Sequence, residues 1–181
     1  MSSINLSVPP IPSAAEFIPV FTFNLKLAQD PTLIYTDASA DKSLTLAHIA
    51  DGEVSTVPNS LGLELDVTGL TGTDDLSVKI SANTASLDCK LYGKTANGSG
   101  VFIHYGGKVQ FNDASVAVLS KKSQTASIED SFVSNTPTFQ FDEGAEDKYK
   151  WVLKEHFFGR GRFARDNEGV LYVQYYIYLV R

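Results

Sequence analysis

The C-terminal segment VLYVQYYIYLV, residues 170–180, carries apolar or aromatic side chains on both faces of a strand. Successive side chains of a strand point to opposite faces, so alternate positions share a face. Both faces must therefore be covered, which predicts a strand within a closed or layered β fold. We expect the face with Tyr172, Gln174 and Tyr176 to line a wet or ligand-filled interior, although the reverse orientation stays open.

The rest of the chain alternates between short apolar strands and polar turns. The clearest strand is 17–27, in which four apolar residues recur at period two. Further strands are expected at residues 44–49, 61–67, 76–80, 86–95, 101–111, 116–119, 138–142, 149–158 and 161–164. Turns are expected at residues 50–52, 69–75, 96–100, 143–148 and 166–169. The turns at 96–100, with its Asn-Gly pair, and at 166–169 should close hairpins.

These strands predict an all-β protein, because no helical period runs long enough for a large helix. An antiparallel β-barrel with an internal cavity, lipocalin-like or closed up-and-down, is favoured because closure removes exposed strand edges. The 181 residues, 43% of them hydrophobic, suit a single domain at 16–181. Residues 1–15 hold three prolines and should form a flexible arm. The Ser-rich segment 120–135 should be a mobile loop or a short helix.

Charge and cysteine content bear on partners and location. The net charge of -6 and the pI near 5.0 disfavour binding to nucleic-acid phosphates. No apolar run reaches the roughly 20 residues of a membrane span, and the N-terminus lacks the pattern of a signal peptide. The single Cys89 forms no internal disulfide. We therefore expect a cytoplasmic protein with neither nucleic-acid nor membrane partners.

Familiar metal, nucleophile and nucleotide motifs are missing. His48, His104 and His156 lack the short spacing of zinc ligands. No Gly-x-Ser-x-Gly elbow is present, and Cys89 sits mid-strand among apolar residues, which is typical of a buried inert thiol. The segment 159–162, Gly-Arg-Gly-Arg, lacks the spacing of a Walker loop or a dinucleotide fingerprint. No metal or cofactor is therefore expected.

A predicted hairpin supplies polar candidates for a site. Asp88, Lys90 and Tyr92 share one face of its first strand, and Phe102 and His104 share one face of its second. In a barrel lumen these side chains could grip a polar ligand, with Lys90 or His104 polarising an oxygen. On an outer face they would be solvated, and His104 would make a structural hydrogen bond.

The C-terminal third adds aromatic and cationic candidates. Trp151 and Phe157 share one face of the segment 149–158 and either shape a cavity or anchor the core. Arg162 offers a guanidinium fork for a carboxylate, phenolate or enolate, with surface ion pairing as the alternative. The predicted catalytic residues are Lys90, His104 and Arg162. The predicted substrate-binding residues are Glu64, Asp88, Tyr92, Phe102, Trp151, Phe157, Tyr172, Gln174 and Tyr176.

Two stretches resemble the small β-barrel family catalogued as domain of unknown function 3237. They are SLDCKLYGKTANGSGVFIHYGGKV, residues 86–109, and KYKWVLKEHFFGRGRFARDNEGVLYVQYYIYLV, residues 148–180, about a third of the chain. The long segment 114–136 and the proline-bearing N-terminus depart from the family pattern. The resemblance implies a barrel with an internal cavity. It also implies a likeness to fungal tailoring proteins of secondary-metabolite pathways and to small barrels that act as cyclases or pericyclases.

Three functional hypotheses follow. The first is a cofactor-independent enzyme that holds a hydrophobic polyene or quinone-methide-like substrate and promotes cyclisation or (hetero-)Diels–Alder cycloaddition. The second is a non-catalytic carrier or sensor that binds a hydrophobic ligand in the same cavity. The third is a structural or assembly protein, with a homodimer formed through the aromatic C-terminal strand.

Overall fold

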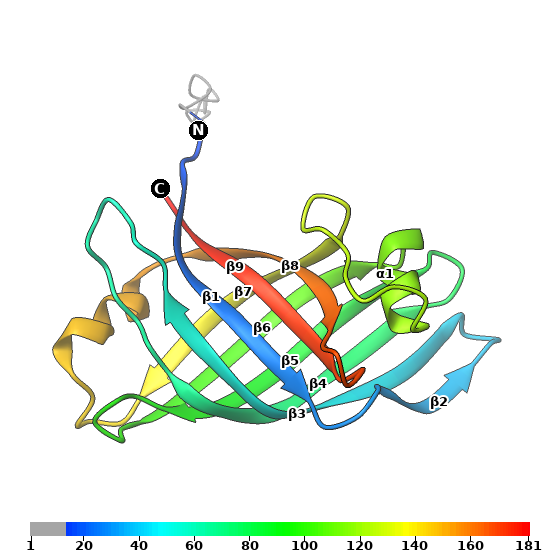
Figure 1. The fold of residues 1–181 in the computed structure, drawn as a ribbon, viewed down its shortest axis with the longest axis horizontal. Coiled ribbons are helices and arrows are strands. Elements are labelled where there is room, and N and C mark those ends of the chain that lie inside the picture. The colour runs from blue at the N-terminus through cyan, green and yellow to red at the C-terminus, as the bar shows by residue number, and fades with distance from the viewer. Residues whose placement is uncertain (1–13) are drawn as a thin grey trace, which may run out of the picture.

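The computed structural model describes residues 14–181, and the fold is a closed antiparallel β-barrel of eight strands (Figure 1). The barrel strands are β1 (Phe17–Leu27), β3 (Lys42–Thr56), β4 (Thr68–Lys79), β5 (Thr84–Lys94), β6 (Gly100–Gln110), β7 (Phe132–Phe141), β8 (Phe157–Arg165) and β9 (Leu171–Val180). The predicted barrel is thus confirmed. The expected arm at residues 1–15 lies, except for its last two residues, outside the described residues.

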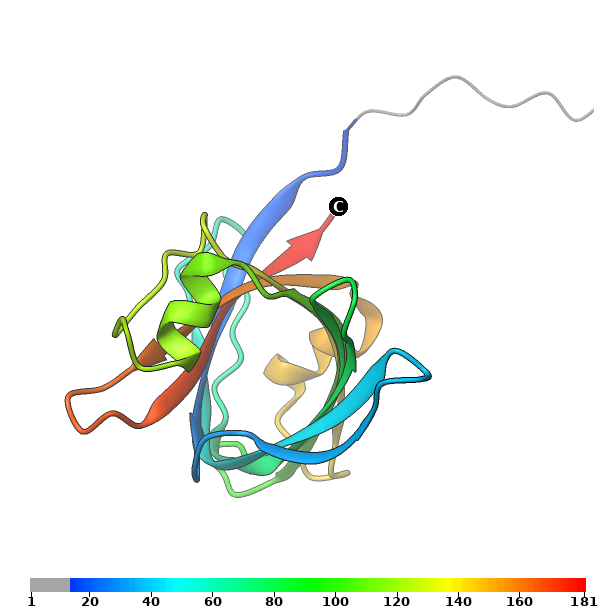
Figure 2. The same ribbon diagram turned by 90° about the vertical axis from the view of Figure 1, so that its right-hand side faces the viewer.

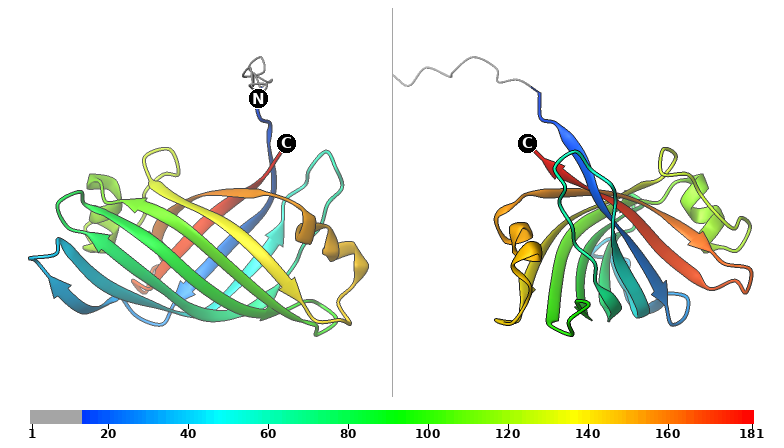
Figure 3. Two further views of the ribbon diagram at one scale, coloured as in Figure 1. Left: turned by 180° about the vertical axis from the view of Figure 1, so that it is seen from behind. Right: turned by 60° about the vertical axis from the view of Figure 1, so that its left-hand side comes forward.

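The first and last strands close the barrel. β1 pairs antiparallel with β9 on one side and with the second half of β3 on the other. β2 (Thr32–Asp37) pairs with the first half of β3 and projects from one end of the barrel (Figures 1 and 3). The two hairpins predicted from their turn residues are confirmed, since β5 pairs with β6 and β8 pairs with β9. Gly98 and Gly169 provide the positive φ that these turns need.

The interior is packed with large side chains rather than left open. Phe21 lies at its centre, with ring centroids 5.4 Å from Phe157, 5.7 Å from Phe139 and 5.9 Å from Phe23. Such aromatic packing supplies much of the apolar burial that stabilises a barrel of this size. Alternate residues of every barrel strand contribute to this core, as period-two alternation requires.

β9 presents its two faces in the orientation opposite to the expected one. Tyr175, Ile177 and Leu179 are buried inside, whereas Tyr172, Gln174 and Tyr176 point outward, with Tyr176 43% exposed. The expectation that the latter face lines the interior is therefore wrong. Packing explains the choice: Ile177 and Leu179 fill the lumen without bringing polar atoms into it, and Gln174 finds hydrogen-bond partners on the outside.

A 3-10 helix, η1 (Asp147–Lys154), closes one end of the barrel, where a strand at 149–158 was predicted. Tyr149 and Val152, three residues apart, are both buried, which fits one turn of a 3-10 helix. The Trp151 ring packs against that of Phe157, with ring centroids 5.7 Å apart, and its Nε1 donates a hydrogen bond to the Glu64 carbonyl oxygen at 2.8 Å. Trp151 and Phe157 therefore anchor and cap the core.

Three other predicted segments differ from the structure. The expected turn at 50–52 lies inside β3, which is long because its first half pairs with β4 and its second half with β1. The expected turn at 69–75 belongs to β4, where Gly72 allows close contact with the Lys90 backbone. Residues 61–67 form only an isolated bridge through Val67 instead of a strand.

Residues 113–119, partly predicted as a strand, form α1 (Asp113–Leu119). Asn112 begins this helix with a capping box, in which its side chain accepts from the Ser115 backbone N–H at 3.0 Å. Residues 120–131, which follow, contain one isolated bridge, between Thr125 and Ala164, so that residues 124–126 lie along the edge of β8 that β7 leaves unpaired. Among residues 14–181, no helix has the length and apolar character that a membrane crossing requires.

Candidate functional site

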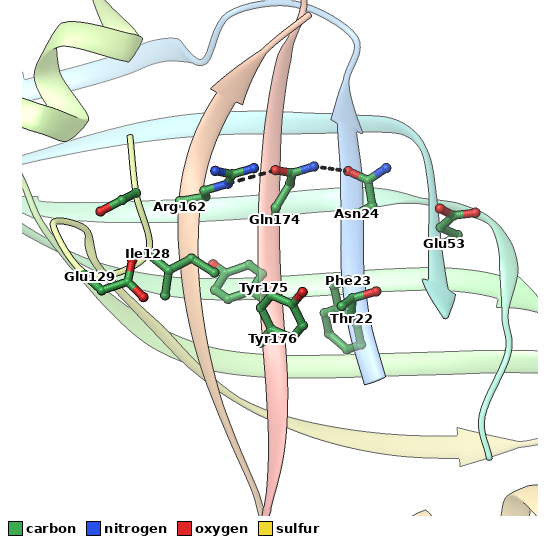
Figure 4. A pocket seen from close by; sticks show the side chains of 11 residues that line it. Thr22, Phe23, Asn24, Glu53, Ile128, Glu129, Arg162, Gln174, Tyr175 and Tyr176 are labelled. Atoms are coloured by element: carbon green, nitrogen blue, oxygen red, sulfur yellow. Dashed lines mark hydrogen bonds between the residues drawn. The ribbon is translucent and has the colours of Figure 1, made fainter. Parts of the chain in front are cut away.

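A groove of about 530 Å³ lies on the outer face of β1, β8 and β9 (Figure 4). The loop that holds residues 127–129 forms its second wall. A volume of this size is typical of small-molecule sites. The lining residues are Thr22, Phe23, Asn24, Glu53, Ser127, Ile128, Glu129, Arg162, Gln174, Tyr175 and Tyr176.

A row of four polar side chains crosses the groove. Arg162 is paired in register with Gln174, Gln174 with Asn24, and Asn24 with Glu53, so four adjacent strands each present one residue. Because neighbouring strands are about 4.8 Å apart, the row from Arg162 to Glu53 spans roughly 14 Å. The groove can therefore contact a molecule with polar groups at two separated positions.

Hydrogen bonds fix the direction of this row. Arg162 Nε donates to Gln174 Oε1 at 3.0 Å, and Gln174 Nε2 donates to Asn24 Oδ1 at 3.0 Å, as the dashed lines in Figure 4 show. Gln174 thus accepts from Arg162 and donates to Asn24. This arrangement holds the Arg162 guanidinium in place without neutralising its charge.

Arg162 remains available to an anionic group. Its side chain is half-buried, and Nη1 contacts the Ala126 carbonyl oxygen at 3.5 Å. Within residues 14–181, no ion pair joins Arg162 to a carboxylate, although Glu53 and Glu129 line the same groove. A guanidinium held in this way is suited to a carboxylate, phenolate or enolate oxygen. Beside it, the half-exposed ring of Tyr176 and the side chain of Ile128 offer apolar surface.

Three of the predicted site residues meet in this groove: Arg162, Gln174 and Tyr176. Tyr172 lies in an adjoining cavity of about 460 Å³ that shares Asn24 and Glu53 with the groove. The two cavities thus form one surface depression along β1 and β9.

Asp88, Lys90 and His104 meet one another, but outside the barrel. Asp88 accepts from Lys90 at 2.9 Å and lies 2.7 Å from His104 Nε2, and all three side chains are 42–52% exposed. Lys90 and His104 together hold the pKa of Asp88 below its usual value, and Asp88 raises the pKa of Lys90. The lumen alternative for these residues is wrong and the outer-face alternative, with a structural hydrogen bond at His104, is the observed one, because Leu87, Cys89 and Leu91 occupy the inner face of β5.

The remaining predicted residues also lie outside the groove. Tyr92 and Phe102 pack against each other on the outer face, with ring centroids 5.4 Å apart. Glu64 is exposed, with its carboxylate 3.9 Å from the Lys148 ammonium. Trp151 and Phe157 belong to the capped end of the core. The expected lumen assignment of Tyr92 and Phe102 is therefore also wrong, since both point away from the interior.

Several residues of the site were not predicted. Asn24 and Glu53 sit on strands whose outer faces gave no distinctive pattern, and residues 127–129 belong to a segment interpreted only as a loop or a short helix. The inner face holds another unpredicted group, Asp74, in a segment interpreted as a turn. Burial raises the pKa of Asp74 to about 7.

Known structures share this fold over nearly the whole chain. A conserved protein of unknown function from Rhodopseudomonas palustris is 19% identical, with a TM-score of 0.68, covering 94% of this chain and 100% of that one. A β-barrel-like protein from Acinetobacter baumannii is 16% identical, with a TM-score of 0.65, covering 96% and 100%. An enzyme from Penicillium herquei is 14% identical, with a TM-score of 0.53, covering 95% and 99%. At these identities the likeness shows the fold alone.

No curated protein matches the sequence. The family described as "Protein of unknown function (DUF3237)" matches residues 15–180, which include every barrel strand and every residue of the groove. The chain therefore belongs to the DUF3237 family.

Proposed function

We propose that the chain is a cofactor-independent enzyme of secondary-metabolite biosynthesis that binds its substrate in the outer groove. The substrate is a hydrophobic polyene or quinone-methide-like compound with an oxygen that gains negative charge during reaction. The observation that carries this proposal is the Arg162–Gln174–Asn24 row, which holds a cation beside the aromatic surface of Tyr176. The assignment to secondary metabolism rests on the resemblance noted from the sequence, and a catalytic role agrees with the Penicillium herquei neighbour, which is described as an enzyme.

Cyclisation and cycloaddition suit such a site because both need positioning and electrostatics more than reactive side chains. In a (hetero-)Diels–Alder step two new σ bonds replace two π bonds, and no atom enters or leaves. The groove would hold the reacting ends close together, and Arg162 would stabilise charge on the oxygen as it develops. Gln174 would keep the guanidinium aimed at that oxygen through its hydrogen bond.

Mass spectrometry of the purified protein with extracts of its source organism tests this proposal. We expect a product with the same mass as its precursor, or with the summed mass of two precursors, formed without added metal or nucleotide. Arg162→Met should reduce its rate of formation by about 100-fold. Arg162→Lys should recover only part of it, because an ammonium cannot reproduce the fork.

Lys108→Met is the matched control, since Lys108 is an exposed cation on the outer face of β6. Its rate should equal that of the unmodified protein. A compound that binds in stoichiometric amount without conversion would identify a carrier instead. Conversion that Arg162→Met leaves unchanged would remove the groove from the mechanism.

A further inference from the structure

The inner face of the barrel carries a row of polar side chains that the groove does not use. Asp74, Cys89 and Tyr105 are direct cross-strand partners on β4, β5 and β6. The ring of Tyr105 also lies beside that of Tyr175, with the two ring centroids 5.9 Å apart. Polar groups are therefore concentrated at one level of an otherwise aromatic and aliphatic lumen.

Two of the polar side chains on this inner face are left with unpaired atoms. Asp74 is 8% exposed and Asn135 is fully buried. Within the described chain, Asp74 Oδ1 and both polar atoms of Asn135 lack a hydrogen-bond partner. A buried polar atom without a partner costs about 1–3 kcal/mol, so such atoms are rare in native proteins and call for an explanation. One explanation is a ligand that supplies the missing partner.

Space for the Asn135 side chain depends on a glycine. A Cβ on Gly159 would lie 1.9 Å from Asn135 Oδ1. A residue with a side chain at this position would therefore displace the amide. The sequence thus keeps a polar side chain in the lumen where an apolar one would pack without unpaired atoms.

A void of about 30 Å³ lies beside Asp74 and Tyr175, at the end of the barrel opposite η1. Its other lining residues are apolar: Leu27, Pro31, Ala47, Leu76, Leu87, Val109, Phe163, Leu171 and Val173. Figure 2 looks into the barrel from this end, with β2 and α1 toward the viewer and η1 behind. We call these apolar lining residues, Leu27 to Val173 in the list above, the mouth. The void is large enough for one oxygen-bearing group.

We propose that the mouth is a second binding site, in which Asp74 donates a hydrogen bond to the oxygen of a small uncharged molecule. The apolar part of that molecule, one or two methyl-sized groups, would lie among the mouth side chains. A ketone, ether or alcohol has the required acceptor, whereas an ion would lose its hydration against an apolar lining. This site lies on the inner side of the barrel wall and is separate from the groove.

The protonation of Asp74 agrees with this geometry. Burial is the main cause that raises its pKa to about 7; the Asp88 backbone N–H opposes this rise, and the nearby carboxylates of Asp75 and Asp88 add to it more weakly. Cys89, Tyr105 and Tyr175, which share the lumen, have pKa values raised well above their usual ranges and are uncharged. Below neutral pH the carboxyl group is therefore a hydrogen-bond donor in uncharged surroundings.

Fluorine NMR with two isosteric probes, fluoroacetone and 3-fluoro-2-methylpropene, tests the site. At pH 6 we expect fluoroacetone to bind about tenfold more tightly, because only its carbonyl oxygen can accept from Asp74, and an ionised Asp74 has no proton to donate to it. Asp74→Leu should abolish this preference. Asp74→Asn keeps a donor and should retain the preference at both pH 6 and pH 8.5, whereas the unmodified protein should lose much of it at pH 8.5.

Ser77→Ala, on the exposed face of the same strand, serves as the control and should behave as the unmodified protein. Circular dichroism checks that each variant is folded. Equal binding of the two probes to the unmodified protein, an unchanged preference in Asp74→Leu, or no binding of either probe would each overturn the proposal.

Discussion

Asp74 shows how one buried carboxyl group makes stability depend on pH. Its folded-state pKa is about 7, whereas an unfolded Asp has a pKa near 3.9. Between these values the folded chain keeps a proton that the unfolded chain has lost, so stability falls as pH rises. Above about pH 7 the free energy of unfolding is lowered by the full cost of ionising the buried Asp74, and below about pH 4 this cost disappears.

Asp74→Asn should remove this penalty. We expect the variant to be more stable than the unmodified protein at pH 8.5, by up to about 4 kcal/mol, and nearly equal to it at pH 4. Urea unfolding at both pH values measures the difference. Glu143→Gln removes an exposed charge and should show no such dependence. A variant with the same stability gain at both pH values would show that titration of Asp74 is not the cause.

At the scale of elements, Arg165 ties α1 to the barrel. Its guanidinium donates to the carbonyl oxygens of Val118 at 2.8 Å, Leu119 at 3.1 Å and Gly169 at 2.8 Å. It also forms an ion pair with Asp30 at 2.7 Å, and its side chain is only 4% exposed. One residue of β8 thus fixes the C-terminus of α1, the hairpin after β8 and the segment after β1.

Arg165→Met should therefore lower the free energy of unfolding substantially. It would leave three carbonyl oxygens without the charged donor that they share, and a hydrogen bond from a charged group contributes about 1.5–3 kcal/mol, so we expect urea unfolding to show a loss of at least about 3 kcal/mol. Trypsin should also cut faster after Lys121 and Lys122, because the segment that follows α1 loses its attachment. Lys121→Met removes the more exposed partner of Asp30 and should cost less than about 1 kcal/mol. Similar losses in the two variants would contradict this role for Arg165.

Strands could be predicted from the sequence where apolar and polar residues alternate, so that only one face of the strand is apolar. In β5, and in β1 from Phe21 onward, apolar and polar residues alternate, so these strands emerge from period-two spacing. The prediction failed for α1, whose short apolar run resembles a strand until the Asn112 capping box is recognised. It also failed in β4, where the small and polar residues of 69–75 are typical of turns, although Gly72 serves a close backbone contact.

The candidate site was harder to predict than the elements. A strand that is apolar on both faces, as β9 is, does not reveal which face turns inward. The groove further depends on the strand register, which brings Arg162 and Gln174, from the C-terminal part of the chain, beside Asn24, from its N-terminal part. Sequence identified Arg162, Gln174 and Tyr176 as candidates by their chemistry but could not supply the neighbours that orient them.

At the scale of the molecule, the backbone amides of the barrel and those of β2 should differ in their protection from hydrogen exchange. β1 and β9 are hydrogen-bonded on both sides, whereas β2 pairs with β3 alone within the described chain and exposes Leu33, Ile34 and Tyr35. Local opening needs less free energy where few apolar contacts are lost. Hydrogen–deuterium exchange should therefore be faster at residues 32–37 than at 21–25, by at least about 100-fold. Equal protection would indicate that a further contact covers β2.

The seam between β1 and β9 also decides how the molecule can be attached to a surface. Glu16 and Arg181 exchange two backbone hydrogen bonds, so the chain enters and leaves the barrel side by side. The mouth lies at the opposite ends of these two strands, beside Leu27 and Leu171. A tether fused to either terminus would hold the protein by the same rim and turn the mouth toward solution. Immobilised protein should therefore bind small molecules there equally well in both orientations of the fusion.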